Sequence, residues 1–210
     1  MSDEGRTAGR ILVVCTANVC RSPLAELHLR EVLTAGPYAA TRITSAGVRG
    51  LRGEAMCATA RGALDDPELG AQHTAREVTP ELVDDADLVL TMEKEHRGAI
   101  ARLVPGQQGK VFTLREAVAM IEAIRAEGAV PDAVPELVER MRALRGVVRP
   151  SVSEAPPAPR FRLFRRHVPE VPEDGLSVED GHNIDPAAHL RTAEEVRGLT
   201  ARMGAALLPH

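Results

Sequence analysis

The chain has 210 residues, of which 44% are hydrophobic and 27% charged, and its formal net charge is -4 at pH 7. This is a globular composition, long enough for one domain with a single core, and the weak negative charge gives no reason to expect nucleic acid or an anionic membrane as a partner. No apolar run is long enough for a signal peptide or a membrane span, and the three cysteines form no regular framework, so we expect a cytoplasmic protein with reduced thiols. We expect no cofactor and no metal, because no second ligand pair with suitable spacing accompanies Cys15 and Cys20.

The hydrophobic pattern predicts alternating strands and helices. The aliphatic run at residues 11–14 predicts a strand over residues 10–15 that is covered on both faces, and a helix follows at about 23–35, with Pro23 in its first turn. This alternation predicts an α/β fold of three layers, a four-stranded parallel sheet with helices on both faces. The other predicted strands are 41–46, 87–91 and 110–113, and the other predicted helices are about 58–64, 80–86, 93–103, 115–125, 134–145 and 189–208.

Residues 147–182 differ in composition from the rest of the chain. They are rich in proline and carry blocks of like charge, which is typical of a loop or a partly disordered segment. We therefore predict a single domain over residues 1–210 that contains this segment as an insert.

The loop after the first strand carries the predicted chemistry. It holds Cys15 and, six positions later, Arg21 followed by Ser22. A thiol beside an arginine and a helix N-terminus ionises more easily, and the same N–H groups and guanidinium bind phosphoryl oxygens. Ser22 can donate a hydrogen bond to the departing thiolate, and Asn18 suits a positive φ. The phosphate would be encircled by the backbone of Thr16, Ala17, Asn18, Val19, Cys20 and Arg21.

This pattern predicts attack of a cysteine on phosphorus. The structural alternative is that Cys15 is a small buried residue that ends a strand and that Arg21 is a solvated charge at a helix start. The strand directly before the loop and the helix directly after it favour the chemical interpretation.

Residues 14–26, Val-Cys-Thr-Ala-Asn-Val-Cys-Arg-Ser-Pro-Leu-Ala-Glu, resemble the signature of the low-molecular-weight protein tyrosine phosphatases. The similarity continues at residues 45–47, 73–76, 86–92 and 185–186. It implies a flavodoxin-like phosphatase in which Cys15 is the nucleophile, Arg21 binds phosphate and Ser22 is the thiolate partner. It also implies hydrogen-bonded support of the loop by Asn18, Ser45 and His73.

The resemblance further implies that Asp185, which is followed by Pro186, is the general acid. A phenolate leaves a phosphate ester poorly unless an acid protonates it, and the same group then activates water. Asp174 and Asp180 lie nearby, but only Asp185 has the proline and the following helix of the family pattern; the alternative is an ordinary Asp-Pro turn. In this family a cysteine at the place of Cys20 can form a disulfide with an oxidised Cys15, and simple packing is the alternative for Cys20.

The predicted rim of the site departs from the family. Ala187 stands where a tyrosine is usual, and Leu51 stands where an aromatic is frequent. Phe161 and Phe164, in the insert, are candidates for the missing aromatic wall, or they pin a long loop to the core. Leu51 is similar to the bacterial branch that acts on tyrosine autokinases, so the expected partner is a phosphorylated protein such as a bacterial tyrosine kinase, and the expected state is a monomer.

Three other functions remain open at the sequence level. Arsenate reductases share the loop but need further cysteines and typically have glutamine where this chain has Pro23. Protein arginine phosphatases favour threonine at the position of Val19, where an aliphatic side chain suits an aryl ring. A phosphate-binding module without catalysis is the third. Phosphotyrosine hydrolysis through a phosphocysteine is the preferred prediction.

Overall fold

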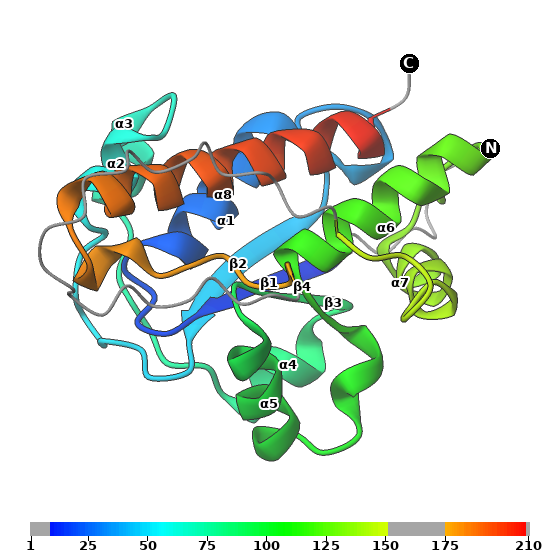
Figure 1. Ribbon diagram of the computed structural model, residues 1–210, viewed down its shortest axis with the longest axis horizontal. Coiled ribbons are helices and arrows are strands. Elements are labelled where there is room, and N and C mark those ends of the chain that lie inside the picture. Colours follow the sequence, from blue (N-terminus) through cyan, green and yellow to red (C-terminus); the bar gives the residue numbers. More distant parts are fainter. Residues whose placement is uncertain (1–8, 151–174, 209–210) are drawn as a thin grey trace, which may run out of the picture.

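The computed structural model describes residues 9–150 and 175–208, and it places four parallel strands in one sheet (Figure 1). The strand order is β2-β1-β3-β4, so β1 and β3 are the central pair. Cys15 at the end of β1 is in register with Gly47 of β2, and Val14 with Thr91 of β3. The strands are β1 (Arg10–Cys15), β2 (Arg42–Gly47), β3 (Leu88–Thr91) and β4 (Val111–Thr113).

Helices cover both faces of this sheet, as the sequence predicted. Alternate residues of β1 point to opposite faces, so Val13 packs in one hydrophobic cluster and Val14 in the other. Figure 1 shows α1, α6 and α8 on one side of the sheet and α4 and α5 on the other. The helices are α1 (Arg21–Val32), α2 (Ala58–Gly62), α3 (Pro67–Ala71), α4 (Pro80–Asp85), α5 (Lys94–Leu103), α6 (Leu114–Glu127), α7 (Val134–Ala143) and α8 (Pro186–Leu207), with short 3-10 helices η1 (Gly36–Tyr38), η2 (Gln107–Lys110) and η3 (Gly181–Asn183).

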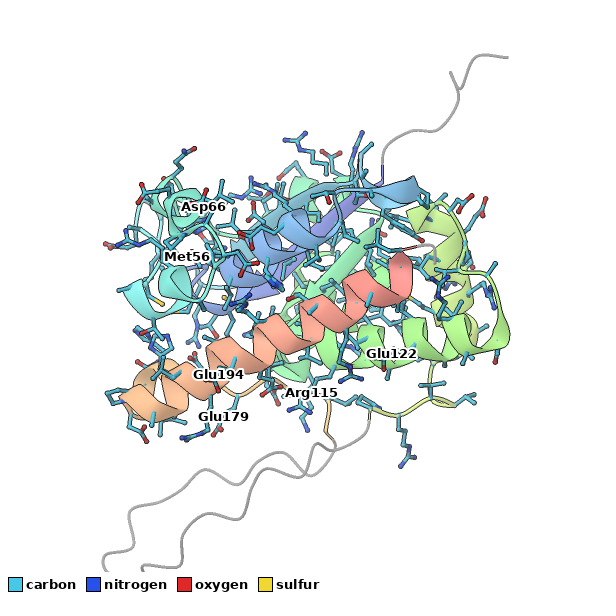
Figure 2. The ribbon with its side chains drawn as sticks, turned by 90° about the horizontal axis from the view of Figure 1, so that it is seen from above. Met56, Asp66, Arg115, Glu122, Glu179 and Glu194 are labelled. Carbon is cyan, nitrogen blue, oxygen red and sulfur yellow. The ribbon has the colours of Figure 1, made fainter. Side chains whose placement is uncertain are left out.

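The C-terminal helix α8 closes the larger face. It lies against α1 and α6, and Figure 2 shows Arg115 and Glu122 of α6 alongside it. Ion pairs join the two helices, with Arg202 Nη2 2.6 Å from Glu122 Oε2 and Arg115 Nη2 2.6 Å from Glu195 Oε1. Val196 of α8 shares the large cluster with Phe112 of β4, so the end of the chain is part of the same core as the sheet.

The structure differs from the sequence prediction at the start of α8 and at α3. Helix α8 begins at Pro186 and not at residue 189, because Asp185 caps it: Asp185 Oδ1 accepts a 2.8 Å hydrogen bond from Ala188 N. Helix α3 was not predicted, although Asp66 and Pro67 provide a similar cap and first-turn proline. No helix among the described residues has the length and apolar content needed to cross a membrane.

Candidate active site

The loop between β1 and α1 lies where the topology of the sheet favours a ligand site. From β1 the chain goes to β2 on one side and then to β3 on the other, so the connections diverge at the carboxyl ends of β1 and β3. The β1 end supplies Cys15 and the loop, and the β3 end supplies Glu93 and His96. The side chains of the β1–α1 loop and of the segment after β3 therefore converge at one edge of the sheet.

Cys15 is buried at this edge, with 3% of its surface exposed. Its Sγ lies 3.0 Å from Ser22 Oγ and accepts a 3.3 Å hydrogen bond from Asn18 N. Ser22 stands in the first turn of α1, whose N-terminal dipole adds positive potential beside the sulfur. These contacts all stabilise a thiolate, the form of cysteine that acts as a nucleophile.

The structure brings the three predicted support residues together behind the loop. Asn18 has a φ of 61°, the only positive value among the non-glycine residues that the structure describes, which fits a loop that turns back on itself. Its Nδ2 donates to Ser22 Oγ at 3.0 Å and to Ser45 Oγ at 2.8 Å. Its backbone carbonyl oxygen accepts a 2.8 Å hydrogen bond from His73 Nε2. Arg76 N donates to Asn18 Oδ1 at 2.9 Å, so the Asn18 side chain is held at both ends.

Gly47 lets β2 approach this loop closely. A Cβ at this position would lie 2.6 Å from the carbonyl oxygen of Thr16 and 2.9 Å from Asn18 N. Only glycine leaves room for the loop to pass at this distance.

Arg21 is buried with 3% exposure and carries two acidic partners. Its Nη1 contacts Glu93 Oε1 and donates to the carbonyl of Val178 at 3.0 Å. Its Nη2 donates to Asp180 Oδ2 at 2.7 Å. Burial alone would lower the pKa of Arg21, but the negative charges of Cys15, Glu93 and Asp180 outweigh it and raise that pKa. The guanidinium is thus a fixed cation beside the thiol.

The predicted acid, Asp185, immediately precedes α8, and its catalytic role stays a prediction. Its side chain is exposed and serves as the N-cap of α8, whereas the carboxylate that contacts Arg21 is that of Asp180, in the segment before η3. The reason is geometric: Val178 bonds to the end of β3 through Val178 N and Met92 O at 2.7 Å, which brings the following residues to the loop. Asp180 lacks the family pattern in the sequence, because glycine and not proline follows it.

His96 and Glu93 were also missed by the sequence analysis. His96 Nδ1 accepts a 3.2 Å hydrogen bond from Glu93 N, so its proton is on Nε2, which donates to Thr16 Oγ1 at 3.0 Å. Burial, with nearby Arg21 as a further cause, lowers the pKa of His96 to about 4. His96 is therefore neutral at physiological pH and holds the loop through a hydrogen bond, without adding positive charge.

His96 makes stability depend on pH in the acid range. A histidine whose pKa is about 4 when folded and 6.5 when unfolded binds more protons in the unfolded state between these values. Its contribution is complete above pH 6.5 and is lost as the pH falls to 4, a decrease of about 3 kcal/mol in the free energy of unfolding. Urea denaturation of the wild type and of His96→Gln should reveal this as a steeper decline for the wild type; equal slopes would contradict it.

Cys20 does not stand alone in the loop. Its Sγ lies 3.4 Å from His182 Nδ1, and Cys57 Sγ lies 3.4 Å from His189 Nε2. A hydrogen bond to Cys57 and burial raise the pKa of the Cys20 thiol, while that same bond lowers the pKa of Cys57. The ligand atoms of these four residues all lie within 4.8 Å of one another, a cluster that the sequence spacing did not reveal. The predicted Cys15–Cys20 redox pair stays a prediction.

The two predicted rim residues that the structure describes, Leu51 and Ala187, are both exposed to solvent. Leu51 is 52% exposed, and its N–H donates to the carbonyl of Ala17 at 3.0 Å, which holds the segment after β2 against the loop. Ala187 is exposed in the first turn of α8. Phe161 and Phe164 lie outside the described residues, so their predicted role stays a prediction.

Comparison with known proteins agrees with this geometry. A family model described as low molecular weight phosphotyrosine protein phosphatase matches residues 10–148. The low molecular weight protein-tyrosine-phosphatase Wzb of Salmonella typhimurium is 37% identical over 104 residues, covering 49% of this chain and 66% of Wzb. The protein-arginine-phosphatase of Bacillus subtilis is 35% identical over 108 residues, covering 51% of this chain and 71% of that protein. The aligned stretch thus spans just under two thirds of Wzb.

The solved structures extend the likeness to the whole fold. The tyrosine phosphatase Wzb from Escherichia coli K30, solved with phosphate, superposes with a TM-score of 0.60 at 20% identity, covering 96% of this chain and 100% of that one. The YwlE arginine phosphatase from Geobacillus stearothermophilus gives 0.60 at 22% identity, covering 95% and 92%. These structures have the flavodoxin-like fold that the sequence resemblance implied. Since the family match covers more than half of its 210 residues, the chain belongs to the low molecular weight phosphotyrosine protein phosphatase family.

Proposed function

We propose that the chain is a phosphatase that hydrolyses phosphotyrosine and related aryl phosphate monoesters through a phosphocysteine intermediate. The observation that carries this proposal is the position of the buried Cys15 sulfur, 3.0 Å from Ser22 Oγ and 3.3 Å from Asn18 N, in the loop that ends at Arg21. Such a loop binds a phosphoryl group and stabilises a thiolate with the same groups.

In the first step the Cys15 thiolate attacks phosphorus and the bond to the aryl oxygen breaks. Arg21 and the backbone N–H groups of residues 16–21 stabilise the charge on the phosphoryl oxygens. The aryl oxygen leaves as a phenol if an acid gives it a proton. Asp180 Oδ2 accepts a hydrogen bond from an N–H of Arg21 that a phosphate oxygen also needs, so phosphate binding would free this carboxyl group. In its protonated form the freed carboxylic acid would give its proton to the aryl oxygen and become the carboxylate.

In the second step water attacks the phosphocysteine and the sulfur–phosphorus bond breaks. The carboxylate that gave its proton takes one from the water, and the sulfur leaves as a thiolate. Ser22 Oγ, which accepts from Asn18 Nδ2, can turn its own proton toward the sulfur and stabilise it. We assign the acid and base role to Asp180 in place of Asp185. The family-model match, which ends at residue 148, reaches neither of them.

The substrate class rests on the loop residue Val19 and on the printed names of the relatives. Val19 is half-buried and packs against the core, so its aliphatic side chain offers no hydroxyl to a guanidinium. We propose a phosphorylated protein as the partner, with phosphotyrosine preferred. Phosphoarginine is the second candidate, because a protein-arginine-phosphatase is among the relatives.

The test compares two peptides with the same flanking residues, one carrying phosphotyrosine and one phosphoarginine. We expect the wild type to release phosphate from phosphotyrosine with a kcat/KM at least about tenfold higher, the size of effect that pocket contacts of this kind provide. Val19→Thr, the matched variant, should move the ratio toward phosphoarginine. Equal or better hydrolysis of phosphoarginine by the wild type would contradict the assignment, and release from neither peptide would indicate a phosphate-binding module.

A further inference from the structure

Two cysteines and two histidines meet beside the active-site loop and are unused by the proposed reaction. Cys20 ends the loop as the N-cap of α1, and Cys57 is the N-cap of α2. His182 lies in η3, and His189 lies in the first turns of α8. Their four side-chain ligand atoms are within 4.8 Å of one another, and Cys20 and His189 are buried.

The spacing of these atoms is that of ligands around one tetrahedral ion. Zinc binds cysteine sulfur at about 2.3 Å and histidine nitrogen at about 2.0–2.1 Å, so a sulfur and a nitrogen on one tetrahedral ion lie about 3.5 Å apart. The distance from Cys20 Sγ to His182 Nδ1 is 3.4 Å, and that from Cys57 Sγ to His189 Nε2 is also 3.4 Å. The two imidazole rings stand edge to face at 88°, with their centroids 4.7 Å apart, so both can direct a nitrogen to a common point.

Backbone contacts hold these residues in place independently of any ion. Cys57 N donates to the carbonyl of Val19 at 2.8 Å, which fixes the start of α2 against the loop. Gly181, next to His182, donates to Thr192 Oγ1 at 3.1 Å, and a Cβ on it would meet the carbonyl oxygen of Ala188 at 2.3 Å. The segment bearing His182 therefore packs tightly on the turn of α8 that bears His189.

We propose that Cys20, Cys57, His182 and His189 bind one zinc ion. Two thiolates and two imidazoles are a ligand set that zinc prefers, and the four side chains complete a tetrahedron without a position for water or substrate. A closed site of this kind is structural and takes no part in the reaction. Carboxylate-binding ions such as magnesium and calcium do not suit sulfur ligands.

The zinc site would hold together the two segments that carry Arg21 and Asp180, which the proposed reaction requires to be neighbours. Cys20 directly precedes Arg21, and His182 follows Asp180 by two residues. His182 N also donates to Asp180 Oδ1 at 3.2 Å. The ion would therefore fasten the segment that bears Asp180 to the loop that bears Cys15, across residues that are far apart in the chain. The metal site itself does not depend on the phosphatase proposal, because its test measures binding.

The test is a titration of the reduced full-length chain with cobalt(II), a spectroscopic substitute for zinc. We expect binding of one equivalent, with the visible bands of a tetrahedral ion and a thiolate-to-cobalt charge-transfer band, and loss of both when one equivalent of zinc is added. Cys57→Ser and His189→Gln should each weaken binding by more than about 100-fold, since even an outer partner of a ligand contributes about 10–100-fold. Cys15→Ser, which removes a thiol of the same loop outside the cluster, should leave the spectrum and stoichiometry unchanged.

A second measurement keeps the test valid if a ligand variant fails to fold. In the wild type, one equivalent of zinc should protect Cys20 and Cys57 from alkylation while Cys15 still reacts, as read by mass spectrometry of the peptides. The proposal is overturned if the reduced wild type gives no charge-transfer band, if Cys15→Ser abolishes it, or if zinc leaves Cys20 and Cys57 reactive. The proposal is also overturned if the protein is isolated with a Cys20–Cys57 disulfide and binds no metal once that disulfide has been reduced.

Discussion

Replacing Cys15 with serine is expected to lower the rate of phosphate release from an aryl phosphate by at least about 10⁴-fold, the scale on which loss of a nucleophile acts. The contacts at Cys15 Sγ stabilise an anion, but an alcohol ionises far less readily than a thiol, so a serine at this place stays protonated. Steady-state release of inorganic phosphate from p-nitrophenyl phosphate measures the loss.

The same variant should still bind phosphate, because Arg21 and the backbone of the loop remain. Calorimetric titration with inorganic phosphate should give dissociation constants within about threefold for the two proteins, a difference of about 0.7 kcal/mol at most. This control separates loss of chemistry from loss of the site. A Cys15→Ser protein that binds phosphate and keeps a few per cent of the activity would refute the phosphocysteine mechanism.

The sheet and its helices were predictable because their signals are local. The aliphatic run of β1 has no polar position, as expected for a strand with both faces covered, and Pro23 marks the first turn of α1. The loop between them was predictable for the same reason, since Cys15, Arg21 and Ser22 lie close in sequence. Asn18 and its partners Ser45 and His73 needed the family resemblance, because nothing in their spacing indicates that they meet.

The remaining site residues depend on long-range packing. Glu93 and Asp180 reach Arg21 from a loop after β3 and from the segment before η3, and no periodicity indicates either. The same holds for the cluster around Cys20, whose members come from four separate elements. Sequence spacing finds metal ligands when they lie on one short motif, and it fails when tertiary structure assembles them.

An Asp-Pro pair such as Asp185-Pro186 fits two interpretations, a catalytic motif of the family and the start of a helix. In this chain a capping side chain followed by proline begins three described helices: Asp66 caps α3, Thr79 caps α4 and Asp185 caps α8. In each case the side-chain oxygen accepts a hydrogen bond from a backbone N–H of the first turn. The local signal was thus correct for a helix start, and the carboxylate at the arginine had to be found from the fold.

This distinction leads to opposite expectations for two conservative variants. Asp180→Asn should lower kcat for phenyl phosphate by about 10²–10⁴-fold, the usual contribution of a general acid. Asp185→Asn should leave kcat unchanged, because in this proposal Asp185 only caps α8 and asparagine caps a helix as well as aspartate does. Asp185→Ala, which removes the cap, should lower the free energy of unfolding by about 1 kcal/mol. Steady-state kinetics and urea denaturation of the three variants provide these numbers.

The leaving group decides whether Asp180 acts as an acid or only positions Arg21. A poor leaving group such as phenolate needs a proton in the transition state, while dinitrophenolate does not, so the defect of Asp180→Asn should shrink strongly on dinitrophenyl phosphate. A carboxylate that only orients Arg21 through the 2.7 Å contact would affect both substrates equally. An equal defect on both substrates would therefore exclude Asp180 from the proton transfer. A larger defect in Asp185→Asn than in Asp180→Asn would support Asp185 as the general acid.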